Sequence, residues 1–322
     1  MFSTNHGSVS PRATAVAAGT AAVAAATAVW VRRKAQRAQR DHPPIGSFVD
    51  VDAVRLHFVE HGEGSPIVLL HGNTVLLQDF IASGLFDRLA EGHRVIAFDR
   101  PGFGYSERPR DRLWTPSAQA ALFERAFARL GIENPVVVGH SWGTLVALAL
   151  AIEQPSSVRG LVLASGYYYP TARIDALLTA PVALPLLGDL MRYTVTPVFA
   201  RMVFRKMVET MFTPLPVAAR FFEQLSRELM LRPGQLRANA EDAAFMVPAA
   251  ARFQSRYPDL RLPVRIFAGE RDRVVSPRAH AARLHGELPD SELTVLPHAG
   301  HMVHYAASEQ IAAAAASLSL DR

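Results

Sequence analysis

Short apolar runs and longer amphipathic stretches alternate along most of this chain of 322 residues. Residues 48–51 and 54–59 alternate apolar and polar positions, which predicts two antiparallel strands. Five further apolar runs have the length of buried strands, at residues 66–70, 94–98, 135–138, 158–163 and 263–268. Helical stretches separate several of them, at residues 78–90, 116–130 and 143–153. This repetition predicts an α/β fold: a mostly parallel central sheet with helices on both faces.

The alternation stops between Tyr167 and residue 258, where apolar helical segments are interrupted by prolines. This stretch is too long for a loop, so it predicts a helical cap inserted into the core. Its apolar side chains, at residues 177–187 and 197–212, predict either a lipophilic acyl pocket or the internal packing of the cap. The predicted domains are an N-terminal tail with an apolar helix (1–31), a basic linker (32–47), the α/β core (48–166 and 259–322) and the cap (167–258).

The N-terminal segment 13–31 contains nineteen uncharged residues, ten of them alanine. As a helix it would be about 28 Å long, close to the roughly 30 Å hydrocarbon core of a bilayer. Trp30 and the cations Arg32, Arg33 and Lys34 follow, which is typical of a membrane exit on the cytoplasmic side. We therefore predict a single-pass membrane anchor with the body in the cytoplasm. The alternatives are a cleaved signal peptide for export, a mitochondrial-type presequence, and a soluble or disordered alanine-rich tail.

The net charge of +5 does not indicate a nucleic-acid partner. Residues 1–40 hold six cations and no acid, so residues 41–322 carry a net charge of −1. A nucleic-acid-binding protein carries its cations on a folded face, and here they are in the tail. The absence of cysteine excludes disulfides, thiolate catalysis and cysteine-ligated metals.

The strongest chemical signal is Gly139-His140-Ser141-Trp142-Gly143. It follows a buried strand and opens a helix, which is the context of a nucleophile elbow. A tight turn of this kind brings neighbouring backbone close to the serine, so the two glycines keep bulk away. The motif therefore predicts that Ser141 is a nucleophile.

A serine nucleophile needs a base and an acid that orients the base. With these motifs, residues 48–322 resemble the α/β-hydrolase fold family, whose triad follows the order Ser, Asp, His. The resemblance implies Asp272 as the acid, because it follows a predicted strand, and His301 as the base, because it follows Gly300 in a loop near the C-terminus. The alternatives are Glu270 for the acid, and His298 or His304 for the base.

The strand-end turn His71-Gly72-Asn73 matches another segment of the family. It implies an oxyanion hole made by the backbone N–H groups of Asn73 and Trp142. We expect His71 and His140 to be structural. The segment from Asp99 to Ser106 also matches the family, and we assign it no chemical role.

Position 141 distinguishes chemistries within the family. Epoxide hydrolases and haloalkane dehalogenases of this fold use a carboxylate there, although Asn73 and Trp142 resemble residues that hold the leaving group in such enzymes. Ser141 instead favours acyl chemistry, so we predict a serine hydrolase acting on a small or lipophilic carboxylic ester, without a cofactor or metal. The same triad also performs amide hydrolysis, carbon–carbon bond hydrolysis and perhydrolysis. A different class is a hydrolase-fold protein that binds a small ligand without cleaving it.

Overall fold

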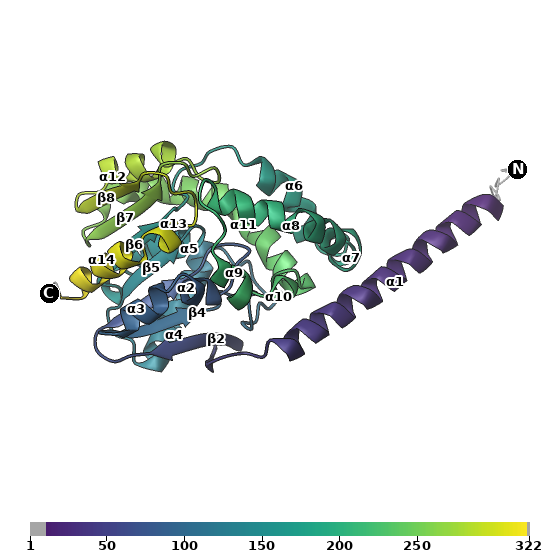
Figure 1. The fold of residues 1–322 in the computed structure, drawn as a ribbon, viewed down its shortest axis with the longest axis horizontal. Coiled ribbons are helices and arrows are strands. Elements are labelled where there is room, and N and C mark those ends of the chain that lie inside the picture. Colours follow the sequence, from purple (N-terminus) through teal and green to yellow (C-terminus); the bar gives the residue numbers. More distant parts are fainter. Residues whose placement is uncertain (1–10, 321–322) are drawn as a thin grey trace, which may run out of the picture.

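The chain folds around one eight-stranded sheet with the order β1-β2-β4-β3-β5-β6-β7-β8 (Figure 1). The computed structural model describes residues 11–320, so the predicted tail at residues 1–10 lies outside the described residues. The strands are β1 (Ser47–Val51), β2 (Val54–His61), β3 (Pro66–Leu70), β4 (Arg94–Phe98), β5 (Val136–His140), β6 (Gly160–Ala164), β7 (Val264–Gly269) and β8 (Ser291–Leu296).

The strand pairing confirms a mixed, mostly parallel sheet. β1 and β2 pair antiparallel, as predicted, and β2 also pairs antiparallel with β4. The pairs from β4 through β3, β5, β6 and β7 to β8 are all parallel. The seven predicted strands are present, β3 and β4 with the predicted ends and the other five with ends shifted by one or two residues, whereas β8 was not predicted. This edge strand is only partly buried, so it lacks the continuous apolar run that marks a buried strand.

Helices cover both faces of the sheet because successive strand residues point to opposite sides. The core helices are α2 (Gln78–Ala82), α3 (Leu85–Ala90), α4 (Pro116–Leu130), α5 (Gly143–Glu153), α12 (Arg283–Glu287), α13 (Val303–Ala306) and α14 (Ser308–Leu320). On β3, Ile67 and Leu69 pack in one apolar cluster with helices α2, α3 and α14, and Val68 and Leu70 pack in the other with α4 and α5. Short helical turns lie at Pro155–Ser157, Gln254–Asp259 and Arg278–Ala282.

A helical insertion between β6 and β7 is present as predicted (Figure 1). Its helices are α6 (Ile174–Ala183), α7 (Leu187–Tyr193), α8 (Val195–Phe212), α9 (Ala219–Gln224), α10 (Arg227–Met230) and α11 (Pro233–Phe253). The C-terminal half of α8 is buried in a third apolar cluster, through Phe204, Val208 and Phe212. We call this insertion the cap.

Many apolar side chains of the cap face outward. Leu177 and Leu178 are each 74% exposed, Phe199 64% and Met202 77%. The prediction that these residues fill an acyl pocket or pack inside the cap was therefore wrong for them. Apolar composition alone does not tell which face of a helix meets a neighbouring element.

The N-terminal helix α1 (Pro11–Asp41) extends away from the body (Figure 1). It includes the apolar segment 13–31 and continues through the basic residues that were expected to form a linker, ending before Pro43 and Pro44. Within the described part of the chain, it is the one helix long and apolar enough to cross a membrane, judged by length and composition. Its apolar part is almost entirely exposed, while Val31 and Ala38 are buried where α1 meets the cap.

Candidate active site

Ser141 lies in the turn that joins β5 to α5. Its backbone φ is +50°, in the left-handed region, and its N–H donates to the Ala164 carbonyl at 2.8 Å. A Cβ atom on Gly143 would lie 2.1 Å from the Leu70 carbonyl oxygen, so no larger residue fits there. The turn is therefore packed between the ends of β3 and β6, and the serine side chain lies at the carboxyl edge of the sheet.

The structure brings Ser141, His301 and Asp272 together from three separate loops. The Ser141 Oγ lies 2.9 Å from the His301 Nε2, and the His301 Nδ1 lies 2.7 Å from the Asp272 Oδ2. The side chains of His301 and Asp272 are each only 2% exposed. This is a continuous hydrogen-bonded line from a hydroxyl group through an imidazole to a carboxylate, as nucleophilic serine catalysis requires.

The Asp272 carboxylate is fixed from its other side. Its Oδ1 accepts hydrogen bonds from the backbone N–H groups of Val274 at 2.7 Å and Val275 at 2.9 Å. These bonds orient Oδ2 toward the imidazole, and they provide hydrogen-bond partners for a side chain that is only 2% exposed. Glu270, the alternative acid, is exposed at the strand end.

The loop that carries His301 is held by the cap. The His301 N–H donates to the Met211 carbonyl of α8 at 2.9 Å, and a Cβ atom on Gly300 would lie 2.2 Å from the Thr213 carbonyl oxygen. Of the alternative bases, His298 is exposed, and His304 is buried with its Nε2 2.9 Å from the Asp79 Oδ2. The geometry therefore singles out His301 as the imidazole next to the serine.

The turn His71-Gly72-Asn73 lies directly against the elbow. A Cβ atom on Gly72 would be 3.0 Å from the Ser141 Cβ. Among the residues that the structure describes, neither the Asn73 N–H nor the Trp142 N–H donates a hydrogen bond, so both remain available to an oxygen atom near the serine.

The side chains of Asn73 and Trp142 are engaged elsewhere. The Trp142 indole N–H donates to the Asp242 carbonyl of α11 at 2.9 Å. The Asn73 Oδ1 accepts from the Arg100 Nη2 at 2.9 Å, and its amide nitrogen donates to the Asn239 carbonyl at 3.5 Å. In this structure, therefore, these side-chain donors bind cap backbone instead of pointing to a leaving group.

Arg100 is a site residue that sequence reasoning missed. Its guanidinium is completely buried and pairs with Asp242 at 2.6 Å. It also donates to the His71 carbonyl at 2.8 Å and the Gly72 carbonyl at 3.2 Å. Arg100 therefore fixes the two carbonyl groups directly before Asn73, and so it positions the backbone N–H of Asn73. Its position in the family-like segment after β4 was visible in the sequence, but its partner Asp242 lies 142 residues away.

His71 and His140 support the site as uncharged groups. Burial, followed by the nearby Arg100 cation, lowers the pKa of His71 to about 3. The neutral His71 ring therefore donates from Nδ1 to the Gly72 carbonyl at 2.7 Å. Its Nε2 accepts a hydrogen bond from the backbone N–H of Arg100 at 3.0 Å. Burial, together with the neighbouring imidazoles of His304 and His301, holds the pKa of His140 well below its usual value.

A second polar cluster lies behind the elbow, and the sequence did not predict it. Asp79, His140 and His304 are buried and offer three potential metal-ligand atoms within 4.8 Å of one another. The Asp79 carboxylate already accepts hydrogen bonds from the His304 Nε2 at 2.9 Å and from the Tyr305 hydroxyl at 2.8 Å. Hydrogen bonds within the protein therefore satisfy both oxygen atoms of the Asp79 carboxylate.

The sequence matches known hydrolases. The profile of a family described as alpha/beta hydrolase fold matches residues 65–307. The chain is 26% identical over 278 residues to haloalkane dehalogenase 2 of Mycobacterium tuberculosis, covering 85% of this chain and 94% of that protein. It is 29% identical over 287 residues to 2-hydroxymuconate semialdehyde hydrolase of Pseudomonas putida, with the same two coverages of 85% and 94%.

Solved structures share the fold. A thermophilic esterase from Thermogutta terrifontis superimposes with a TM-score of 0.66 at 22% identity, covering 84% of this chain and 97% of the esterase. A membrane phospholipase A superimposes with a TM-score of 0.64 at 22% identity, covering 95% of this chain and 94% of the phospholipase.

We expect Arg100→Met to destabilise the protein by about 3 kcal/mol, the lower end of the cost of breaking a buried ion pair. The Asp242 carboxylate loses its contact with Arg100 but keeps the Arg108 guanidinium at 2.9 Å. The matched control is Arg110→Met, which removes a partner of the partly exposed Asp189 at 2.9 Å and should cost about 0–1 kcal/mol. Urea unfolding in detergent solution, followed by tryptophan fluorescence, measures both. Equal losses in the two variants would contradict the role given to Arg100.

Proposed function

The chain belongs to the α/β-hydrolase fold family, and we propose that within it the protein is a serine hydrolase that cleaves carboxylic esters through an acyl-enzyme intermediate. The observation that carries this proposal is the line of hydrogen bonds at 2.9 and 2.7 Å that joins Ser141 to His301 and His301 to Asp272.

The reaction follows from these contacts. Ser141 Oγ attacks the ester carbonyl carbon while His301 Nε2 takes its proton, and Asp272 stabilises the imidazolium. The carbonyl oxygen becomes an oxyanion and accepts the N–H groups of Asn73 and Trp142, each worth about 3–4 kcal/mol in comparable sites. The C–O bond then breaks, and the alcohol leaves with the proton from His301. Water, deprotonated by His301, attacks the acyl group and releases the acid and Ser141. No cofactor enters this scheme.

Two features favour acyl chemistry over dehalogenation. The dehalogenases of this fold need a carboxylate at the nucleophile position, where this chain has Ser141. The Trp142 indole N–H, a group suited to hold a departing halide, donates instead to the Asp242 carbonyl.

Carbon–carbon bond hydrolysis is a second candidate, because one relative is named 2-hydroxymuconate semialdehyde hydrolase. A serine triad is compatible with both reactions, so a substrate comparison separates them. Turnover of a series of p-nitrophenyl esters, without turnover of 2-hydroxymuconate semialdehyde, supports the ester hydrolase. The reverse result supports the second candidate, whereas a ligand that stabilises the protein and stays uncleaved would indicate a binding protein.

We further propose that α1 anchors the enzyme in a membrane, with the body in the cytoplasm. The helix is apolar and exposed over the length of a bilayer, and its downstream end carries Arg32, Arg33 and Lys34. The match to the membrane phospholipase A covers 95% of this chain, compared with 84% for the esterase, which supports a shared N-terminal segment.

We expect Ser141→Ala to lower ester turnover by roughly 10⁴- to 10⁶-fold without loss of folding, since the nucleophile is removed while the oxyanion donors remain. Labelling by a fluorophosphonate probe should disappear in the same variant. Thr144→Ser, at the start of α5, keeps a hydroxyl and is the control that should retain both. Near-wild-type activity of purified Ser141→Ala would exclude this serine as the nucleophile.

His301→Ala should lose about as much activity as Ser141→Ala, and the double variant should lose little more, because the two groups act as one unit. Steady-state kcat/KM values for the two single variants and the double variant provide the measurement. His298→Ala, at an exposed position in the same loop, should keep its activity. Losses that add up in the double variant would show that Ser141 and His301 act independently.

We expect the full chain to stay in membranes after a carbonate wash, and Val23→Arg combined with Ala24→Arg to be washed off. Each cation at the centre of a spanning helix costs about 2.5–3.5 kcal/mol. Gln36→Arg lies in the basic part of α1 and is the control that should remain bound. Protease digestion of the body from the outer side of intact cells would overturn the predicted orientation.

A further inference from the structure

The outward face of the cap carries a large set of apolar side chains, which we call the cap apolar face. It is formed by α6, the turn before α7, α7 and the first half of α8. Six representative residues leave 60–84% of their surface exposed: Leu177, Leu178, Leu186, Leu190, Phe199 and Met202. Scattered apolar residues are normal on a protein surface. Here the helices that carry them pack against one another, α6 on α7 and α7 on α8, and a large apolar patch marks an interaction site.

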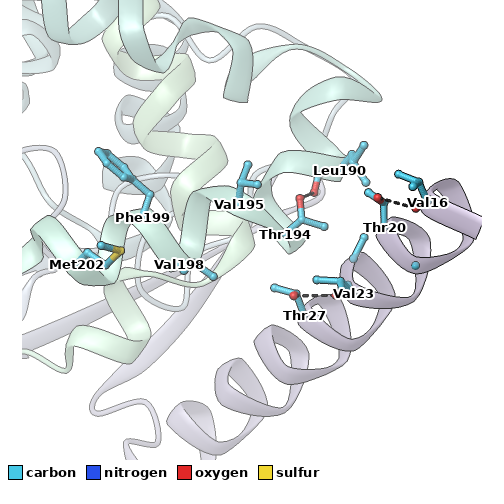
Figure 2. Close-up of a pocket in the computed structure, with 12 residues that line it drawn as sticks. Val16, Thr20, Val23, Thr27, Leu190, Thr194, Val195, Val198, Phe199 and Met202 are labelled. Atoms are coloured by element: carbon cyan, nitrogen blue, oxygen red, sulfur yellow. Dashed lines mark hydrogen bonds between the residues drawn. The ribbon is translucent and has the colours of Figure 1, made fainter. Parts of the chain in front are cut away.

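This face borders the apolar helix α1. A groove of about 850 Å³ separates α7 and α8 from α1. Figure 2 shows Val16 and Val23 of α1 on one side of the groove, with Leu190 and Val195 of the cap on the other. The groove is therefore lined by apolar side chains from the proposed anchor and from the cap.

One contact joins α8 to α1 near the end of the apolar part of each helix. α8 and α1 run in the same general direction along the groove (Figure 2). The Arg201 guanidinium carbon of α8 lies 4.8 Å from the centre of the Trp30 ring of α1. Beyond this contact, α1 continues with Arg32 to Lys34, and α8 continues with Arg205 and Lys206. A tryptophan followed by cations on α1, with further cations on the neighbouring α8, is the arrangement expected at a membrane–water boundary.

We propose that the cap apolar face is inserted into the lipid bilayer beside α1, so that acyl chains of phospholipids fill the groove. The main alternative occupant is α1 of a second copy of the chain. A single helix would cover the groove, but it would leave Leu177, Leu178 and Leu186 in water, because these residues lie outside the groove lining. A bilayer covers all of them together.

The insertion also indicates a substrate class, a step that rests on the proposed hydrolase function. The N-terminal half of α8 lies in the cap apolar face, and near its C-terminal end the Met211 carbonyl accepts the His301 N–H at 2.9 Å. One helix therefore extends from the proposed bilayer surface to the loop of the catalytic base. The substrate that fits this arrangement is an ester dissolved in the bilayer, with a long acyl chain.

Single cysteines test the bilayer contact directly, because the chain contains none. The full-length variants Leu178→Cys and Phe199→Cys are labelled with an environment-sensitive fluorophore and reconstituted into phosphatidylcholine vesicles. We expect blue-shifted emission that falls at least about two-fold with brominated acyl chains, as for a buried apolar environment. Val23→Cys in α1 is the positive control. Val295→Cys, exposed on β8 at the other end of the body (Figure 1), is the matched control and should behave as in water.

Labels at positions 178 and 199 that emit as in water, while the label at 23 is quenched, would overturn the proposal. Disulfide crosslinking between copies through Val198→Cys, without quenching at 178 and 199, would do so as well and would assign the groove to a second copy. A label at 23 that also stays unquenched would overturn the anchored arrangement on which the proposal is built.

Activity gives an independent measurement. Phe199→Asp combined with Met202→Asp should lower kcat/KM at least about ten-fold for a long-chain ester in vesicles, since charged groups oppose insertion. The same variant should leave kcat/KM for a soluble short-chain ester unchanged. Equal loss on both esters would contradict delivery from the bilayer. Absence of turnover on both esters by the unmodified enzyme would instead refute the proposed function, while the fluorescence result would still decide the bilayer contact.

Discussion

The backbone of Ser141 is the constraint around which the rest of the site is built. A residue with φ of +50° at the end of a central strand is strained, and it persists because neighbouring elements hold it on all sides. β6 accepts its N–H through Ala164, and β3 leaves room for nothing larger than Gly143. With the serine fixed at this edge, the loops after β7 and β8 bring Asp272 and His301 to the same place, because parallel strands end on one side of the sheet.

The buried pair of Arg100 and Asp242 links this edge to the cap. Arg100 belongs to the core and Asp242 to α11, so removing the cap would leave a guanidinium ion without its partner in an apolar interior. The same arginine holds the carbonyls of the turn before Asn73 and stacks on Trp142, with its guanidinium carbon 4.4 Å from the ring. Both residues proposed to supply oxyanion N–H groups are thus positioned by an ion pair that exists only when the cap is folded onto the core.

Local pattern was sufficient for features that depend on neighbours in sequence. The strands and the elbow motif follow from apolar periodicity and from the glycines around Ser141, and the family resemblance led to Asp272 and His301, which the fold brings together. Features that depend on distant partners were missed: the role of Arg100, the cluster of Asp79 with His304, and the half-buried edge strand β8. The cap was predicted as a helical insertion, but its composition did not indicate that Leu177 and Phe199 face outward. That outcome depends on which helix face meets α11 and the core, and periodicity within one helix does not contain this information.

The outward apolar residues have a physical cost that bears on how the enzyme works. Exposure of the Phe199 and Met202 side chains to water is unfavourable. A cap surrounded by water would resist aggregation better with polar residues at these positions. Their presence beside a helix of membrane-spanning length is explained if the cap is solvated by lipid. α8 then meets two requirements at once, since its first half needs an apolar solvent and its second half needs the protein core, where it holds the His301 loop. Under the proposed insertion, a helix divided in this way would fix the depth of the active site relative to the membrane surface. The proposed anchor, the cap and the triad would then have a defined arrangement toward a substrate dissolved in the same bilayer.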